Sequence, residues 1–164
     1  MDVLKIYTYA LQREREGRDF FRSNAGRFGH AAVVDVFEKL AVEEEAHIQF
    51  VQGLIDALET EGTTGIAAGE AMDQAGFFSE RADSEMLDQT VIEAMVPDLA
   101  VLRMAYLIER DFAEFYEMAA EQTDDETAKK SLTMLAGWER RHESLFKQMH
   151  DRAFEEYASM PWGG

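Results

Sequence analysis

The stretch EEEAHIQF, residues 43–50, carries Glu44 and His47 at positions that its surroundings give to apolar side chains. Apolar residues on both sides of it recur at spacings of three and four, which is the period of one face of an α-helix. Glu and His three residues apart lie about 60° apart around a helix axis and about 4.5 Å apart along it, so both can reach one ion. Because a buried carboxylate is costly without a compensating positive charge, the stretch predicts a core helix that binds a cation. The flanking Glu43 and Glu45 are interpreted as part of a solvated face.

The same pair of residues returns 95 positions later, as Glu139 and His142. Each pair follows a helix-period segment that has one Glu on its own apolar face, Glu14 before the first pair and Glu109 before the second. Further identities at this offset are Ala10 with Ala105, Phe20 with Phe115, and Leu40-Ala41 with Leu135-Ala136. We therefore predict an internal duplication of a helical hairpin.

The spacing within each hairpin predicts how deep these side chains lie. Glu14 and Glu44 are equally far from the first turn, and Glu109 and Glu139 are equally far from the second turn. Residues equidistant from the turn of an antiparallel hairpin are level with each other, here about 22 Å from the turn. If the two turns lie at opposite ends, both pairs meet near the middle of the bundle. Four carboxylates and two imidazoles would then converge, and we predict a site for two metal ions.

Few residues interrupt the helical pattern. The sequence has only two prolines, Pro97 and Pro161, and we expect an all-α four-helix bundle built from the two repeated hairpins. We expect a single domain over residues 1–160, with hairpin one at about 2–61, a crossover at about 62–96, hairpin two at about 97–157, and a short tail at 158–164.

The predicted crossover is longer than neighbouring antiparallel helices need, so we expect it to cross the length of the bundle. Residues from about 80 to 95 are expected to form a short extra helix. Four glycines of the crossover predict irregular backbone before that helix: Gly62, Gly65, Gly69 and Gly76.

Composition limits the partners and the chemistry. With 33 acidic and 16 basic residues the formal net charge is −17, which disfavours binding to nucleic acid or to an anionic membrane. The absence of cysteine excludes disulfides, thiolate nucleophiles and cysteine-ligated metals, so a metal must be held by oxygen and nitrogen. The sequence has neither a run of about 18 apolar residues nor a recognisable signal peptide. We expect a cytoplasmic protein without membrane or nucleic-acid partners.

Four segments resemble ferritin-like di-iron carboxylate proteins, most closely the rubrerythrin-like group: ALQREREGRDFF, LAVEEEAHIQF, AYLIERDFAEFY and LAGWERRHESLF. The resemblance covers roughly residues 5–58 and 98–155. It implies a ferritin-like four-helix bundle that binds two iron ions per chain, with manganese or a mixed metal pair as alternatives. The ligands it implies are Glu14, Glu44, His47, Glu109, Glu139 and His142, with Glu44 and Glu139 as the bridges between the ions.

The sequence departs from that group in two respects. Rubrerythrins proper carry a rubredoxin domain with a four-cysteine iron, and this sequence has no cysteine to build one, so we expect an external electron donor. They also usually carry an extra glutamate one turn after the first ligand of the third helix, where this sequence has Phe112. The peroxidase-type metal movement attributed to that glutamate is therefore not expected to operate unchanged.

Three functions are compatible with such a site. The leading hypothesis is oxidation of ferrous iron by dioxygen or reduction of hydrogen peroxide, in iron handling or oxidative-stress defence, by a homo-oligomer for which a dimer is favoured. In it the six side chains act through the metals, and Tyr116 donates a hydrogen bond or an electron, although core packing is the commoner role at its spacing. The second is an oxygenase or hydroxylase with an apolar substrate pocket, which Gly17 opposite Phe112 would open. The third is a non-enzymatic iron-binding or storage protein.

Overall fold

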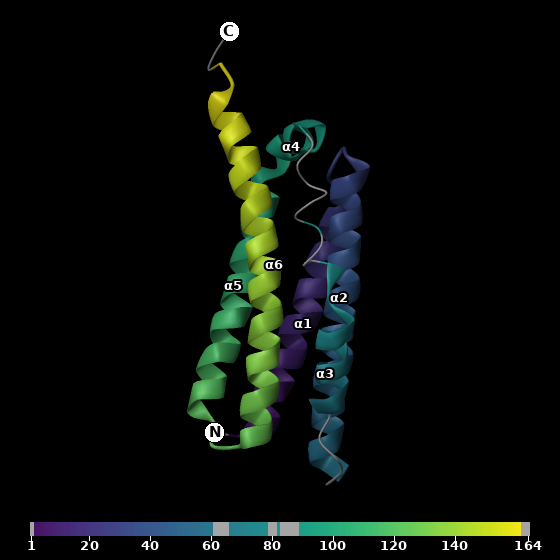
Figure 1. Cartoon of the computed structure of the whole chain (residues 1–164), viewed down its shortest axis with the longest axis vertical. Coiled ribbons are helices and arrows are strands. Elements are labelled where there is room, and N and C mark those ends of the chain that lie inside the picture. The colour runs from purple at the N-terminus through teal and green to yellow at the C-terminus, as the bar shows by residue number, and fades with distance from the viewer. Residues whose placement is uncertain (1, 61–65, 79–81, 83–88, 162–164) are drawn as a thin grey trace.

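Four long helices form the body of the protein. The computed structural model describes residues 2–60, 66–78, 82 and 89–161. The long helices are α1 (Val3–Ala25), α2 (Ala31–Thr60), α5 (Leu99–Gln122) and α6 (Glu126–Ser159), which lie side by side as a bundle (Figure 1). Two begin at an aspartate whose carboxylate accepts a backbone N–H, Asp2 from Lys5 at 3.4 Å and Asp125 from Ala128 at 2.8 Å. The predicted all-α four-helix bundle is confirmed.

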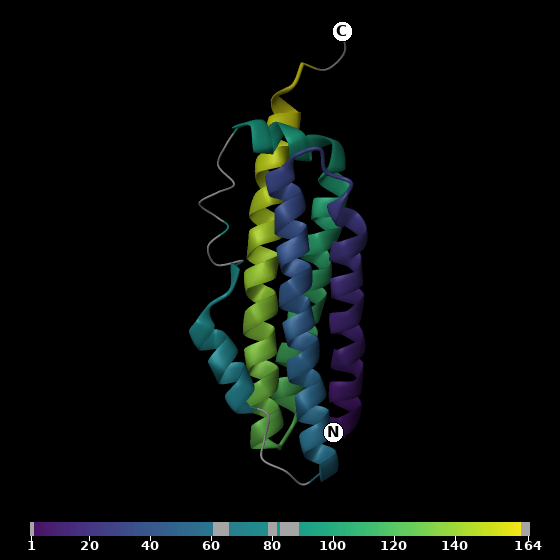
Figure 2. The same cartoon turned by 90° about the vertical axis from the view of Figure 1, so that its right-hand side faces the viewer.

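The two hairpins point in opposite directions along the bundle. Helices α1 and α2 are joined at one end, and α5 and α6 are joined at the other end, so the two turns are separated by the full length of the helices (Figures 1 and 2). Because the chain returns along the bundle between the hairpins, α2 and α5 run in the same direction. The middle of each helix therefore lies at one common level.

The described residues of the connection between the hairpins include two short helices. They are α3 (Ile66–Ala75), which packs against α2 and α6, and α4 (Gln89–Met95), which lies across the end of the bundle that carries the α1–α2 turn (Figure 2). A 3-10 turn, Val96–Asp98, holds Pro97 and leads into α5. The extra helix expected near 80–95 is confirmed over Gln89–Met95, and residues 80, 81 and 83–88 of the expected range lie outside the described residues.

Gly69 corrects the expectation of irregular backbone in the crossover. It lies within α3 and is buried, and a Cβ there would meet Phe50 Cε2 at 2.7 Å and Met134 Cε at 2.8 Å. The glycine therefore allows the close approach of α3 to the bundle instead of breaking a helix. Gly76 does end α3, with a φ of 73° that favours glycine. Gly62 and Gly65 lie outside the described residues.

The core is divided into two apolar clusters. One, at the end that carries the α5–α6 turn, includes Tyr7, Leu54 and Leu132, and the other, toward the α1–α2 turn, includes Phe21 and Phe146, whose rings stack at 5.1 Å. Fully burying a large apolar side chain stabilises the fold by about 1.5–3 kcal/mol. These clusters hold the helices rigidly above and below a polar layer at the middle of the bundle.

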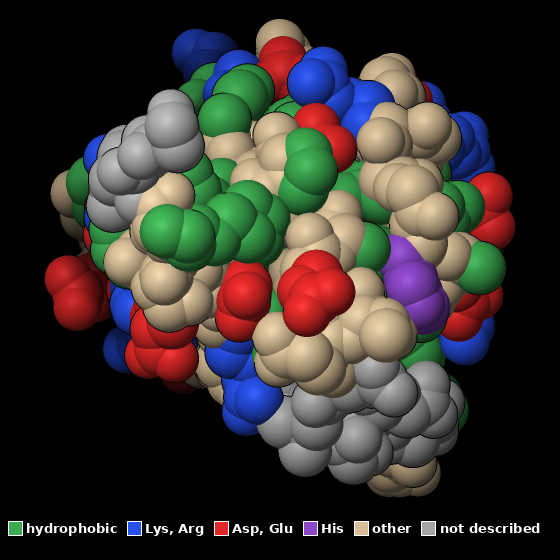
Figure 3. All heavy atoms as spheres, turned by 90° about the horizontal axis from the view of Figure 1, so that it is seen from above, with side chains coloured by type: hydrophobic (Ala, Val, Ile, Leu, Met, Phe, Trp, Pro, Cys, Tyr) green, Lys and Arg blue, Asp and Glu red, His purple; other side chains and the backbone are tan. Residues whose placement is uncertain are grey.

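The exterior is charged, with scattered apolar groups. Seen from the end that carries α4, apolar side chains lie beside acidic and basic ones (Figure 3). Within the described residues, none of the helices combines the length and the apolar character that spanning a membrane requires.

Candidate metal centre

All six side chains singled out in the sequence lie in the polar layer between the two apolar clusters. Helix α1 contributes one glutamate and α5 another, while α2 and α6 each contribute a glutamate and a histidine one turn apart. Their exposed fractions are 0–1% for Glu14, Glu44, His47, Glu109, Glu139 and His142. The structure thus brings together every residue of the predicted set, although their role as ligands stays a prediction.

The six residues form two overlapping groups, each able to hold a metal ion. The first, which we call the His47 group, consists of Glu14, Glu44, His47 and Glu139. The second, the His142 group, consists of Glu44, Glu109, Glu139 and His142. Within each group one oxygen or nitrogen per residue lies within 4.8 Å of all the others. Because Glu44 and Glu139 belong to both groups, two cations bound there would be adjacent and share these two carboxylates.

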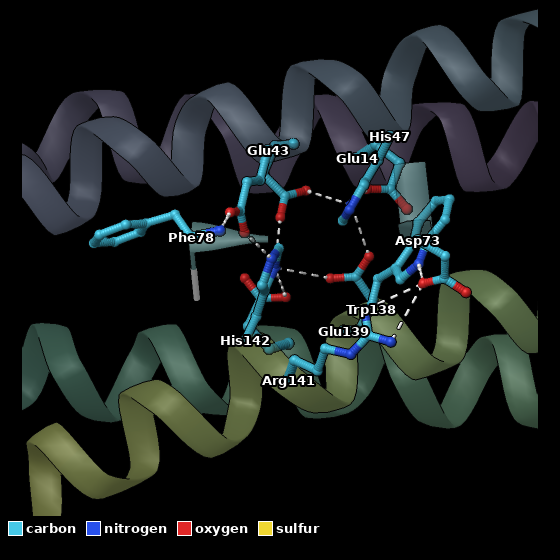
Figure 4. A network of polar contacts seen from close by, with 11 residues as sticks. Glu14, Glu43, His47, Asp73, Phe78, Trp138, Glu139, Arg141 and His142 are labelled. Atoms are coloured by element: carbon cyan, nitrogen blue, oxygen red, sulfur yellow. Dashed lines mark hydrogen bonds and ion pairs between the residues drawn. The ribbon is translucent and has the colours of Figure 1, made fainter. Parts of the chain in front are cut away.

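Both histidines turn the same nitrogen toward the carboxylates. His47 Nδ1 lies 3.2 Å from Glu14 Oε2 and 3.1 Å from Glu139 Oε1. His142 Nδ1 lies 3.0 Å from Glu44 Oε1 and 3.3 Å from Glu139 Oε2. Glu139 therefore lies between the two imidazoles (Figure 4), in the position that a bridging ligand requires.

The remaining carboxylate oxygens test whether the layer fits a metal. In the described part of the chain, both oxygens of Glu44, Glu109 and Glu139 are buried without a regular hydrogen bond. Buried polar atoms are normally satisfied, and these three carboxylates have the two imidazoles, at 3.0–3.9 Å, as their ion-pair partners. Carboxylate oxygen and imidazole nitrogen are donors that iron, manganese and zinc accept. The residues therefore fit a pair of divalent cations.

Without cations, protons offset the buried negative charge. Burial raises the pKa of Glu14 and of Glu109 well above the usual range, and neighbouring carboxylates raise it further. Burial on its own lowers the pKa of His47 and His142, but the surrounding carboxylates outweigh it and raise both pKa values well above normal. For Glu139, burial is outweighed by the two imidazoles, which hold its pKa below the usual range.

Tyr116 supports one glutamate of the layer. Its hydroxyl donates a hydrogen bond to Glu14 Oε1, and the side chain is fully buried. Burial and the nearby carboxylates raise the pKa of Tyr116 well above normal, so the phenol keeps its proton. At the 95-residue offset between the two halves, the counterpart of Tyr116 is Phe21, which has no hydroxyl.

Glu43 corrects its interpretation as part of a solvated face. Its carboxylate is buried and lies 3.0 Å from His142 Nε2, the outer nitrogen of that ring, and it also accepts the backbone N–H of Phe78 (Figure 4). Glu45, in contrast, remains partly exposed and pairs with Arg18 at 2.9 Å. Glu43 is thus held between α6 and the crossover at Phe78, which are tertiary contacts that the helical period of α2 does not encode.

Trp138, the counterpart of Glu43 at the offset of the duplication, contacts His47. Its ring stacks on the His47 ring at 4.9 Å, and its indole N–H donates to Asp73 of α3 at 2.9 Å. Asp73 also accepts from Arg141 at 3.3 Å, so α3 is attached to α6 directly over the polar layer (Figure 4). His47 Nε2 is left buried with no hydrogen bond among the described residues.

The space beside Gly17 is filled, which contradicts the expectation of an apolar substrate pocket there. A Cβ at Gly17 would lie 3.1 Å from Glu44 Oε2 and 3.2 Å from Phe112 Cε2. The glycine gives room for the Phe112 ring and the Glu44 carboxylate instead of opening a cavity. On the outer side of Phe112, between α1 and α5, the surface has a hollow of about 270 Å³.

Comparison with known proteins places this arrangement in a family. A family model described as Rubrerythrin matches residues 5–150, which is most of the chain. Comparisons with curated proteins and with solved structures find no match. The chain belongs to the rubrerythrin family of ferritin-like di-iron proteins, and the resemblance seen in the sequence is confirmed.

Proposed function

We propose that this member of the rubrerythrin family binds two iron ions in the polar layer and uses them to oxidise ferrous iron with dioxygen or to reduce hydrogen peroxide. The observation that carries the proposal is the pair of buried groups that share Glu44 and Glu139. A single carboxylate cluster could be a chance feature of an acidic protein. Two groups that share two ligands at full burial are instead the arrangement that a pair of neighbouring cations would occupy.

The ligand set matches an iron pair in charge and in donor type. Glu14 and His47 would hold one ion, Glu109 and His142 the other, and Glu44 and Glu139 both. Four carboxylates balance two divalent ions, and the donor set contains no thiolate that would favour copper(I). Bound as a ferrous pair, iron would supply two electrons at one place, enough to reduce hydrogen peroxide to two water molecules when two protons are added.

The residues of the chain contribute by holding protons and excluding water. Cation binding must displace the protons on His47 and His142, whose raised pKa values keep both rings charged without metal. Tyr116 holds a proton against Glu14 Oε1, and Glu43 fixes the His142 ring through its outer nitrogen. Because these 164 residues hold no cysteine-ligated iron, we expect electrons for a continuing reaction to come from a separate donor.

Among the alternatives, an oxygenase is the less supported, because the place predicted for its substrate pocket is filled by Phe112 and Glu44. An organic substrate that accelerates oxidation of the ferrous protein would restore that alternative. An iron content far above two per chain would instead indicate storage in an assembly.

Anaerobic iron titration tests the proposal. The apo-protein is titrated with ferrous iron, and the loaded protein is mixed with dioxygen or with hydrogen peroxide in a stopped-flow instrument. We expect two ferrous ions per chain and oxidation of both by at least one of the two oxidants. A stoichiometry well below two, or loaded protein that is inert to both, would overturn it.

A further inference from the structure

We infer that the hollow between α1 and α5 is the route by which a small uncharged oxidant reaches the metal layer, and that the Phe112 ring determines the size of what passes. The inference rests on the proposed function and names its substrate class, dioxygen or hydrogen peroxide as opposed to bulky organic peroxides or charged oxidants.

The opposite face of the layer is closed by several independent contacts. Over α2 and α6, the Phe77 ring packs on His47 at 5.9 Å and on Trp138 at 5.5 Å. Asp73 accepts the Trp138 indole N–H, and Gly69 brings α3 into tight contact with the bundle. A molecule arriving from this side would have to displace a helix together with its hydrogen bonds.

The α1–α5 face has a much thinner cover. The hollow is lined by the aromatic rings of Tyr9, Phe112 and Phe115, and Phe112 is the most deeply buried of the three, at 5% exposed. The Phe112 Cε2 atom and the Glu44 Oε2 atom both lie within 3.2 Å of the same point, the position that a Gly17 Cβ would occupy. One aromatic ring therefore stands between the hollow and a shared carboxylate of the metal layer.

The duplication shows why one ring is enough. Phe112 and Gly17 occupy corresponding positions in the two halves, 95 residues apart, and they meet each other over the layer. Two phenylalanines there would collide, and two glycines would leave the Glu44 carboxylate open to water. The combination of one large and one absent side chain therefore leaves a single aromatic ring as the cover.

The lining of the hollow favours uncharged molecules. The charged residues of the lining are Arg13, Glu16 and Asp111. Arg13 pairs with Glu16 at 3.1 Å and lies over the Tyr9 ring at 4.8 Å, so the two carboxylates outnumber the one guanidinium and disfavour the entry of anions. Past the mouth the path is aromatic, and a charged molecule would lose its hydration without gaining a partner. Dioxygen and hydrogen peroxide can cross such a path, since neither carries a charge.

The test uses nitric oxide, an uncharged diatomic molecule, as a probe of access. Ferrous-loaded wild-type protein, Phe112→Ala, Phe112→Trp and the opposite-face variant Phe77→Ala are mixed with nitric oxide anaerobically, and the association rate is followed by absorption. We expect Phe112→Ala to associate about tenfold faster than wild type and Phe112→Trp to associate more slowly, because the barrier is the ring. Phe77→Ala is expected to accelerate association less than Phe112→Ala does.

A second measurement tests size selection. The ratio of oxidation rates with hydrogen peroxide and with cumene hydroperoxide should fall toward one in Phe112→Ala, because the bulky peroxide gains access. If Phe112→Ala does not fold, Phe112→Leu is used instead, and we expect the same changes with a smaller magnitude. The route would be overturned if the association rates and the ratio were unchanged, or if Phe77→Ala accelerated association more than Phe112→Ala. The proposed function would still stand in that case, provided that each chain binds two irons. Chains that bind well below two irons would overturn both.

Discussion

The His47 group and the His142 group have the same ligand types but different support. The outer nitrogen of His142 meets the Glu43 carboxylate at 3.0 Å. The outer nitrogen of His47 is buried without a hydrogen bond among the described residues, and its ring lies against Trp138. Glu43 and Trp138 are counterparts at the offset of the duplication. The two halves have thus diverged at the residues that touch the predicted ligands, although the ligands themselves are the same.

The glutamates show the reverse difference. Glu14, in the His47 group, accepts a hydrogen bond from Tyr116, whereas both oxygens of Glu109, in the His142 group, lack one in the described part of the chain. Each group therefore has one polar supporting contact, on its histidine in one case and on its glutamate in the other. Supporting contacts of this kind orient ligands and tune a bound metal, so the two ions are expected to differ in affinity.

The shared carboxylates should give the largest effect, because they belong to both groups. We expect Glu139→Gln to lower the affinity for each of two bound cobalt(II) ions by at least about 100-fold. Loss of a residue that only contacts a ligand already lowers metal affinity by about 10–100-fold. Glu14→Gln should weaken mainly one ion. Titration of apo-protein with cobalt(II), followed by calorimetry and absorption, measures each step. Glu38→Gln, at an exposed position of α2, is the matched control. Equal losses in Glu139→Gln and Glu14→Gln would show that the groups do not share a ligand.

Glu43 should give the next largest effect, and on one ion only. In Glu43→Gln the carboxamide offers one acceptor oxygen to both His142 Nε2 and the Phe78 N–H, so one of the two contacts is lost. We expect the ion of the His142 group to bind about 10–100-fold more weakly and the other ion to be unaffected. Trp138→Phe, which keeps a ring against His47, serves as the comparison. A loss spread equally over both binding steps would contradict the assignment of Glu43 to one group.

The contrast between the six central residues and Glu43 shows what could be predicted from the sequence. The convergence of the six follows from helical period and from equal distances to each turn, both of which are local properties of the chain. Glu43 lies off the apolar stripe of α2, and its carboxylate is buried between His142 of α6 and the crossover at Phe78. The expectation of irregular backbone at Gly69 was wrong for the same reason, because the role of this glycine depends on where α3 packs. The docking of a long connection has no periodic signal.

The pH dependence of the apo-protein should show that protons replace the cations. The raised pKa values of His47, His142, Glu14 and Glu109 mean that the folded state binds these protons more tightly than the unfolded state. The resulting contribution to the free energy of unfolding is fully present below the pKa values of the unfolded state. It is lost as pH rises through the pKa values of the folded state, at about 1.4 kcal/mol per unit of pKa difference. The lowered pKa of Glu139 acts in the opposite sense, and only in acid.

Thermal unfolding from pH 5.5 to 8.5 measures this effect. We expect the melting temperature of the apo-protein to fall as pH rises, and cobalt(II) binding to release protons and to strengthen with pH. Apo-protein of the double variant Glu14→Gln, Glu109→Gln should lose less stability over the same range, because two of the titrating groups are gone. A melting temperature that rises with pH in the apo-protein would mean that the layer is hydrated and not the buried cluster seen in the structure.

Tyr116 should give the smallest effect, and it allows the comparison to be reversed. In Tyr116→Phe, Glu14 loses a hydrogen bond worth about 1–2 kcal/mol, so the melting temperature should fall by about 2–8 °C. The ion of the His47 group should change its affinity less than tenfold, and the other ion should not change. Adding Phe21→Tyr, at the counterpart position, offers a hydroxyl to Glu109 instead, at the expense of the stacking of Phe21 on Phe146. If the double variant shifts the affinity change to the ion of the His142 group, the support is a transferable hydrogen bond. If the His47 group alone responds in both variants, Tyr116 acts through packing and the difference between the groups lies in their histidines.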